Sequence, residues 1–137
     1  MNTMTDLAGI RAGHPLHEKM RIGGERVGGS RVIEVRNPYT GAVVGTVPKA
    51  SVEEIRRAFA FARAYKPTLT RYQRYEICRR TAEIIRSRAE VISDLITAEC
   101  GICKKDSLYE AGRACDVFVF AGNAALVDDG QVFSCDL

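Results

Sequence analysis

Arg113 is the residue whose type and surroundings point most directly to chemistry. It lies in a stretch, residues 111–127, in which nearly every other residue is small or apolar. A buried guanidinium is costly to desolvate, so such an arginine needs an anionic partner. Glu110 and Asp116, each three residues away, offer an ion pair, and the residue spacing alone favours this explanation. The alternative is a ligand whose carboxylate, phosphate or phosphonate is held by the planar guanidinium fork.

Cys100 and Cys103 have the CxxC spacing of a redox pair or of half a zinc site. No second CxxC or HxxxH pattern completes a zinc set, and no βαβ pattern surrounds the pair. We therefore expect neither a metal site nor a redox site here. The serines, cysteines and histidines also form no recognisable pair of nucleophile and base, so we expect no catalytic residue in this chain.

The glycines Gly23, Gly24, Gly28 and Gly29 do not spell GxGxxG and do not lead from a strand into a helix. That pattern is what a dinucleotide pyrophosphate requires. The sequence therefore predicts turn glycines and no cofactor-binding residue.

The composition is that of an ordinary folded chain of about one domain's length. It has 137 residues, a net charge of +3, 46% hydrophobic residues and 27% charged residues. It contains no apolar run long enough to span a membrane and no cationic start followed by an apolar block. Its five cysteines are an odd number at irregular spacing, which is unlike a secreted disulfide framework. We expect a cytoplasmic protein with reduced thiols and no membrane partner.

Charge is unevenly distributed along the chain, with a net +5 in residues 51–90 and −5 in residues 91–137. A basic segment could bind nucleic acid, but this one alternates in sign. On a helix, one side would carry Glu76, Arg79, Arg80, Glu83, Arg86 and Glu90. A mixed-sign face of this kind is typical of a solvated surface, so we do not expect a nucleic-acid partner.

The elements that would position these residues can be read from the hydrophobic periodicity. Residues 1–18 show none, and we expect a flexible tail. Short strands are predicted at residues 20–22 and 31–35, and a turn at residues 37–41 leads to a partner strand at residues 42–47. Ser51 and Glu54 form a capping box for a helix that reaches about residue 64, where Pro67 prevents its continuation.

Three further helices are expected. One begins near residue 70, with an inward face formed by Tyr75, Cys78, Ala82, Ile85 and Ala89; the next begins near Arg88 and ends at Gly101. Ser107 and Glu110 form a second possible capping box before residues 111–127, which should make a helix that is buried all round. Residues 131–137 begin to look like a strand.

The order of these elements and several strings resemble the amino-terminal portion of the aldehyde dehydrogenase superfamily. The matching pieces are residues 22–25, residues 35–41 with their Asn-Pro-x-Thr-Gly turn, Val47, the capped helix of residues 51–64, Arg74, and residues 99–101 before the helix that contains Glu110. The resemblance covers roughly residues 20–137. It implies an α/β fold: an outer β-hairpin, a helical layer and the start of an oligomerisation strand, all within an incomplete Rossmann-like domain.

Within the superfamily, residues 69–72, 106–113 and 128–137 look like the phosphonoaldehyde branch, which includes phosphonoacetaldehyde and phosphonoformaldehyde dehydrogenases. In that branch an arginine that matches Arg113 is implied to hold the substrate's phosphonate. The resemblance therefore favours Arg113 as the substrate-binding residue. It also implies that residues 19–137 are the amino-terminal part of the cofactor domain and that residues 131–137 open the oligomerisation arm.

The family's cysteine nucleophile, glutamate base and NAD(P)-binding core match no part of this sequence. The resemblance therefore implies the amino-terminal segment of a longer enzyme, inactive alone, which uses NAD or NADP to oxidise a small phosphono-aldehyde to its carboxylate. A homo-oligomer, formed through the arm or the apolar helix, is also implied. Two alternatives stay open: a dehydrogenase for another small anionic aldehyde, and a non-catalytic module for folding or assembly.

Overall fold

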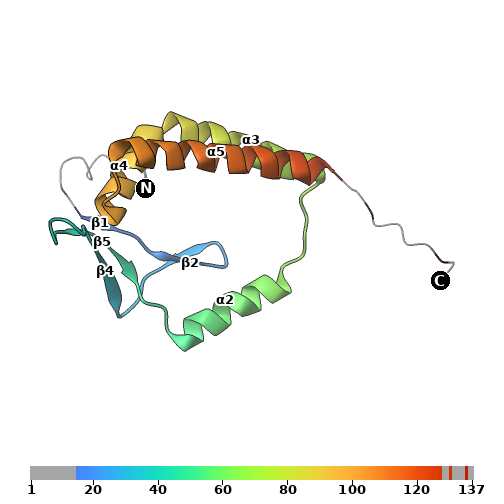
Figure 1. Ribbon diagram of the computed structural model, residues 1–137. Coiled ribbons are helices and arrows are strands. Elements are labelled where there is room, and N and C mark those ends of the chain that lie inside the picture. Colours follow the sequence, from blue (N-terminus) through green and yellow to red (C-terminus); the bar gives the residue numbers. More distant parts are fainter. Residues whose placement is uncertain (1–14, 128–129, 131–134, 136–137) are drawn as a thin grey trace.

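The computed structural model describes residues 15–127, 130 and 135. Within these residues, short strands come first in the chain and helices follow (Figure 1). The strands are β1 (Leu16–His17), β2 (Met20–Ile22), β3 (Glu25–Val27), β4 (Val32–Arg36) and β5 (Val43–Pro48). The helices are α2 (Val52–Ala64), α3 (Arg71–Ser87), α4 (Ala89–Cys100) and α5 (Lys104–Leu126).

The strands form two small sheets. β2 and β3 make an antiparallel hairpin, and β4 and β5 make an antiparallel pair with an irregularity between Val35 and Arg36. β1 adds to the other edge of β5 in parallel, with Leu16 opposite Gly45. Residues 16 and 17 of the expected tail are therefore paired in a sheet. Residues 1–14 lie outside the described part of the chain.

The turn between β4 and β5 forms as predicted. The Asn37 side-chain oxygen accepts hydrogen bonds from the backbone nitrogens of Tyr39 and Thr40, both at 2.9 Å. Gly41 takes a φ of 71°, a conformation that favours glycine. The turn is therefore closed by local interactions that the sequence itself supplies.

Side-chain caps start the first two helices. In α2, Ser51 accepts from the Glu54 nitrogen while Glu54 bonds back to the Ser51 nitrogen, so the predicted capping box is confirmed. α3 starts in the same way from Thr70 and Gln73, a box that the sequence analysis did not identify. The end of α4 at Gly101, with φ 72°, is confirmed as well.

α5 differs from the prediction at its start. It begins at Lys104, with Cys103 as an N-cap that makes no side-chain capping bond. Ser107 lies inside the first turn, and its hydroxyl donates to the Lys104 carbonyl at 3.0 Å. The predicted capping box of Ser107 and Glu110 is therefore wrong, because the Ser107 hydroxyl is used between helices rather than at a helix end.

The core lies where α3, α4 and α5 meet, and α3 and α5 run side by side along most of their length (Figure 1). The contact is made of small residues. Ala82 of α3 and Ala111 and Cys115 of α5 are buried, and a Cβ at Gly122 would lie 3.2 Å from the Cβ of Cys78. Small side chains let the two helices approach closely, which is the basis of this packing.

The expectation that α5 is buried all round is wrong for the described residues. Val117 is 62% exposed and Phe120 is 72% exposed. The small residues of α5 face α3, so the large apolar residues on its other faces have no described neighbour to cover them. The inward face predicted for α3 is confirmed for Tyr75, Cys78, Ala82 and Ile85, because Ala82 is buried and the other three are half-buried. Ala89, the fifth residue of that face, belongs to α4 instead.

No helix in the described part of the chain is long and apolar enough to cross a membrane. The predicted strand at residues 131–137 falls almost entirely outside the described residues. The hairpin, the paired strands and the helical layer occur in the expected order, so the predicted α/β segment is confirmed.

Candidate functional site

Arg113 lies on the outside of α5, and its side chain is 61% exposed. Its Nη1 atom lies 3.7 Å from Glu110 Oε1, and its guanidinium carbon lies 6.0 Å from the centre of the Tyr109 ring. The predicted pairing with Glu110 is therefore present, whereas Asp116 is not ion-paired with Arg113. The desolvation argument for an anionic partner does not hold, because this guanidinium is open to solvent.

A hollow with a volume of about 350 Å³ lies beside Arg113, between the end of α3 and the first half of α5. Its polar side chains are Arg86, Tyr109, Arg113 and Asp116, and Ala89 and Leu108 are among its apolar ones. Two guanidinium groups and one carboxylate therefore line one concave surface. Such a surface suits a small anion, because each guanidinium presents several donors in a fixed plane.

Three other charged residues of α3 pair with one another. Arg79 bonds to Glu76 at 3.0 Å and also pairs with Glu83 on the next turn. The hydrogen bond and the charge of Arg79 hold the pKa of the Glu76 carboxyl below its usual value. The mixed-sign face predicted for this helix is therefore present, and three of its six residues pair with one another within the helix: Glu76, Arg79 and Glu83.

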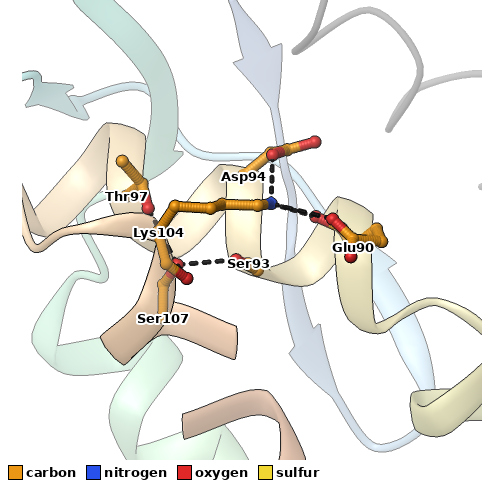
Figure 2. A network of polar contacts seen from close by, with 6 residues as sticks. All are labelled: Glu90, Ser93, Asp94, Thr97, Lys104 and Ser107. Atoms are coloured by element: carbon orange, nitrogen blue, oxygen red, sulfur yellow. Dashed lines mark hydrogen bonds and ion pairs between the residues drawn. The ribbon is translucent and has the colours of Figure 1, made fainter. Parts of the chain in front are cut away.

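A polar network fixes the start of α5 on α4. Ser107 and Ser93 are fully buried, and their hydroxyl oxygens lie 2.6 Å apart. Thr97 donates to the Ser107 hydroxyl at 2.9 Å. Figure 2 shows Lys104 reaching over α4 to Asp94 and Glu90, while Ser107 lies between Ser93 and Thr97.

The ammonium of Lys104 pairs with Asp94 and, at 3.2 Å, with Glu90. These partners, Asp94 foremost, raise the pKa of Lys104. The network holds the turn from which α5 departs, and Arg113 lies less than three turns further along the same helix. It therefore positions the helix that carries the candidate site.

The cysteines and histidines show no catalytic arrangement in the described residues. Cys100 and Cys103 are exposed free thiols, and Cys115 is a buried thiol that contacts the Ala82 carbonyl. His17 bonds to Thr46 at 2.8 Å, on the edge of the sheet. Among the residues described, no cluster of side chains has the composition of a metal site.

The described residues do not fit a dinucleotide by themselves. Gly23 and Gly24 lie in the turn of the β2–β3 hairpin, where Gly23 has φ 60°, and Gly28 and Gly29 precede β4. None of these glycines opens a helix, so the described chain offers no glycine-rich cradle for a pyrophosphate. No cofactor step is therefore assigned to these residues.

Comparison with known proteins gives the family. The profile of the aldehyde dehydrogenase family matches residues 26–136. Lactaldehyde dehydrogenase from Methanococcus aeolicus is 29% identical over 126 residues, covering 84% of this chain and 27% of the relative. 3-Sulfolactaldehyde dehydrogenase from Priestia aryabhattai is 30% identical over 94 residues, covering 68% of this chain and 20% of the relative.

Among solved structures, NAD-dependent aldehyde dehydrogenase from Sinorhizobium meliloti superposes with a TM-score of 0.79 at 27% identity, over 86% of this chain and 25% of that chain. The fold is thus the amino-terminal part of an aldehyde dehydrogenase fold. The chain belongs to the aldehyde dehydrogenase family. It spans between a fifth and about a quarter of the length of the curated relatives, 20–27%.

The expected resemblance to the superfamily is confirmed. The finer likeness to phosphonoaldehyde enzymes stays a prediction. The similar proteins named above are lactaldehyde, sulfolactaldehyde and NAD-dependent aldehyde dehydrogenases. Arg86, which also lines the hollow, was not predicted as a site residue. Its signal was weak, since Arg86 belongs by spacing to the charged face of α3.

Proposed function

We propose that this chain serves as the amino-terminal segment of an NAD(P)-dependent aldehyde dehydrogenase that oxidises a small aldehyde with an anionic end to its carboxylate. The particular substrate we propose is a phosphono-aldehyde, phosphonoacetaldehyde or phosphonoformaldehyde. In this proposal the chain supplies the contact for the anionic end, and the nucleophile, the base and the cofactor core belong to other parts of the enzyme.

One observation carries the proposal: Arg113 presents an accessible guanidinium to a hollow large enough for a small anion. Its pairing with Glu110 is long and exposed, and an exposed ion pair stabilises a structure by only about 0–1 kcal/mol. A ligand anion can therefore replace this pair at little cost. The name of the Priestia relative, a sulfolactaldehyde dehydrogenase, supports an anionic aldehyde as a substrate class for this family.

The domain assignment is part of the same proposal. We take residues 19–137 as the amino-terminal part of the cofactor domain, with residues 131–137 opening an oligomerisation arm. We also propose that the enzyme is a cytoplasmic homo-oligomer. Its subunits would associate through that arm or through the exposed apolar residues of α5.

The test compares substrates in the complete enzyme. We would measure kcat and KM for phosphonoacetaldehyde, a sulfonated aldehyde, a carboxylated aldehyde and neutral propanal. Arg113→Ala should raise KM for the anionic substrates by roughly 10-fold to 100-fold, as expected for a lost hydrogen bond to a charged group, and should leave propanal nearly unchanged. Arg113→Lys should rescue only part of the loss, because the bidentate fork is gone.

Lys105→Ala is the matched control, because Lys105 is an exposed cation at the start of the same helix and does not line the hollow. If Arg113→Ala weakens propanal and the anionic aldehydes equally, the assignment of Arg113 to the anionic end is wrong. If the enzyme prefers the carboxylated or the sulfonated aldehyde, its substrate is that anionic aldehyde and the assignment of a phosphono-aldehyde is wrong.

A second candidate function is a non-catalytic module that packs its apolar helix against a partner chain. It is favoured by the exposed Val117 and Phe120 on α5. The two candidates differ in solution. A self-sufficient module should be monodisperse, with slow amide exchange along residues 111–127, whereas a segment of a larger enzyme should self-associate through its exposed apolar face.

A further inference from the structure

Arg86 shares the hollow with Arg113 but comes from a different element. It lies in the last turn of α3, whereas Arg113 lies midway along α5. Both residues line the hollow of about 350 Å³, and Arg86 also borders a second, smaller hollow of about 130 Å³ further along the same pair of helices. Arg86 therefore stands between two concave surfaces at the contact between α3 and α5.

The two acidic residues at helical spacing from Arg86 pair with other residues. Glu83, three residues before it, pairs with Arg79. Glu90, four residues after it, pairs with Lys104 at 3.2 Å. Within the described residues, Arg86 itself forms no ion pair, although helical neighbours at these spacings are the usual partners of an exposed arginine.

The charge of the hollow follows from its lining. Arg86 and Arg113 contribute two positive charges and Asp116 one negative charge, so the hollow carries a net charge of about +1. Tyr109 adds a hydroxyl to the same lining. A tetrahedral anion with three oxygens can accept hydrogen bonds from two guanidinium groups at once, which one planar carboxylate does less readily.

We propose that Arg86 is a second contact for the anionic end of the substrate, together with Arg113, and that the pair selects a phosphonate or sulfonate over a neutral group. This inference rests on the proposed function and adds to it a residue from a different helix. Asp116 reduces the net positive charge of the hollow to about one unit, so the attraction for an anion comes from the two guanidinium groups.

The experiment uses the complete enzyme and four variants: Arg86→Ala, Arg86→Lys, Arg113→Ala and the control Arg80→Ala. Arg80 is an exposed arginine on the same helix that lines neither hollow. Arg86→Ala should raise KM for phosphonoacetaldehyde about 10-fold or more, with propanal changed less than about 2-fold, and Arg86→Lys should retain part of the affinity. Arg80→Ala should behave as the parent enzyme with both aldehydes.

A second measurement follows binding without turnover. The inhibition constant of methylphosphonate, competing with propanal, should rise in Arg86→Ala and in Arg113→Ala, while thermal unfolding shows that the variants remain folded. If Arg86→Ala does not fold, Arg86→Lys is decisive, because its charge is kept and only the fork is lost. An unchanged methylphosphonate constant in that folded variant overturns the role of Arg86.

The outcomes separate this inference from the proposed function. If KM for phosphonoacetaldehyde rises in Arg113→Ala while Arg86→Ala behaves like the control Arg80→Ala, Arg86 is not a second contact. The proposed function is then unaffected. If KM for phosphonoacetaldehyde rises only in Arg86→Ala, Arg86 contacts the anion and Arg113 does not belong to the site. If neither variant discriminates between the aldehydes, both proposals are wrong.

Discussion

Pro38 packs directly against Gly101. A Cβ built at Gly101 would lie 2.7 Å from Cγ of the Pro38 ring, closer than real Cβ contacts. Pro38 belongs to the turn between β4 and β5, and Gly101 ends α4, so two strings that carry the family resemblance meet in space although they lie far apart in sequence. The contact fixes the small sheet against the helical layer.

Gly101→Ala should lower the free energy of unfolding by about 1–3 kcal/mol, because the residue has φ 72° and no room for a methyl group. Urea denaturation followed by circular dichroism would measure this. Gly112→Ala is the control, since a Cβ there meets no atom within 4 Å and alanine favours the helix by about 0.5–1 kcal/mol. Equal effects of the two substitutions would contradict the close contact with Pro38.

Ser107→Ala should cost about 1–3 kcal/mol of unfolding free energy, because it leaves the buried Ser93 hydroxyl without its partner. The double variant Ser93→Ala/Ser107→Ala should cost less than the two single changes added together, since both ends of the bond are then removed. Ser87→Ala, at an exposed serine that bonds only within its own helix, should change stability by less than about 0.5 kcal/mol. Strict additivity at Ser93 and Ser107 would show that the two hydroxyls are not coupled.

The ion pairs of Lys104 predict a stability change in the alkaline range. Its pKa is raised in the folded chain, chiefly by Asp94. The protonated form is favoured by folding, so its contribution is complete below the ordinary lysine pKa of about 10.4 and is lost as pH rises through the higher folded value. Lys104→Met should therefore flatten the fall in unfolding free energy between about pH 10 and pH 12. Lys105→Met serves as the control, and a parallel fall in both variants would exclude Lys104 as the cause.

Exposed apolar residues on α5 predict association of this 137-residue chain in solution. Val117 and Phe120 are three residues apart and so lie on one face of the helix. Phe120→Glu should lower the weight-average molar mass in sedimentation experiments, because it places a charge within that face. Ala121→Glu adds the same charge on a neighbouring face and should have a smaller effect. A chain that is monomeric at all concentrations would favour the self-sufficient module instead.

Features determined by neighbours in the sequence could be predicted, and features determined by distant residues could not. The Asn37 turn and the Ser51 capping box are closed by residues within four positions, so their residue types were sufficient. The start of α5 was misplaced because the Ser107 hydroxyl is used by Ser93 of another helix. The exposure of Phe120 depends on which face of α5 meets α3, and the small residues that decide this look equally apolar in the sequence.

In the candidate site, too, one residue could be predicted from its sequence neighbours and the other could not. Arg113 stands out in its sequence surroundings, and the structure places its guanidinium beside a hollow. Arg86 belongs by spacing to a solvated face, and only the packing of α3 on α5 brings it to the same hollow. The environment of Arg113 was also mistaken, because an apolar sequence around a residue does not establish that the residue is buried.

α2 is only weakly attached to the rest of the described structure. None of its residues is buried, and it is held mainly by the Phe61 ring against Gly23 and by the Arg57–Glu25 ion pair at 3.0 Å. Its backbone can therefore exchange its amide hydrogens through local opening at a lower free energy than the α3–α5 pair. Among the described residues, the exposed connection of residues 65–70 becomes a site for limited proteolysis. α2 should thus detach by local opening while the three-helix layer remains assembled.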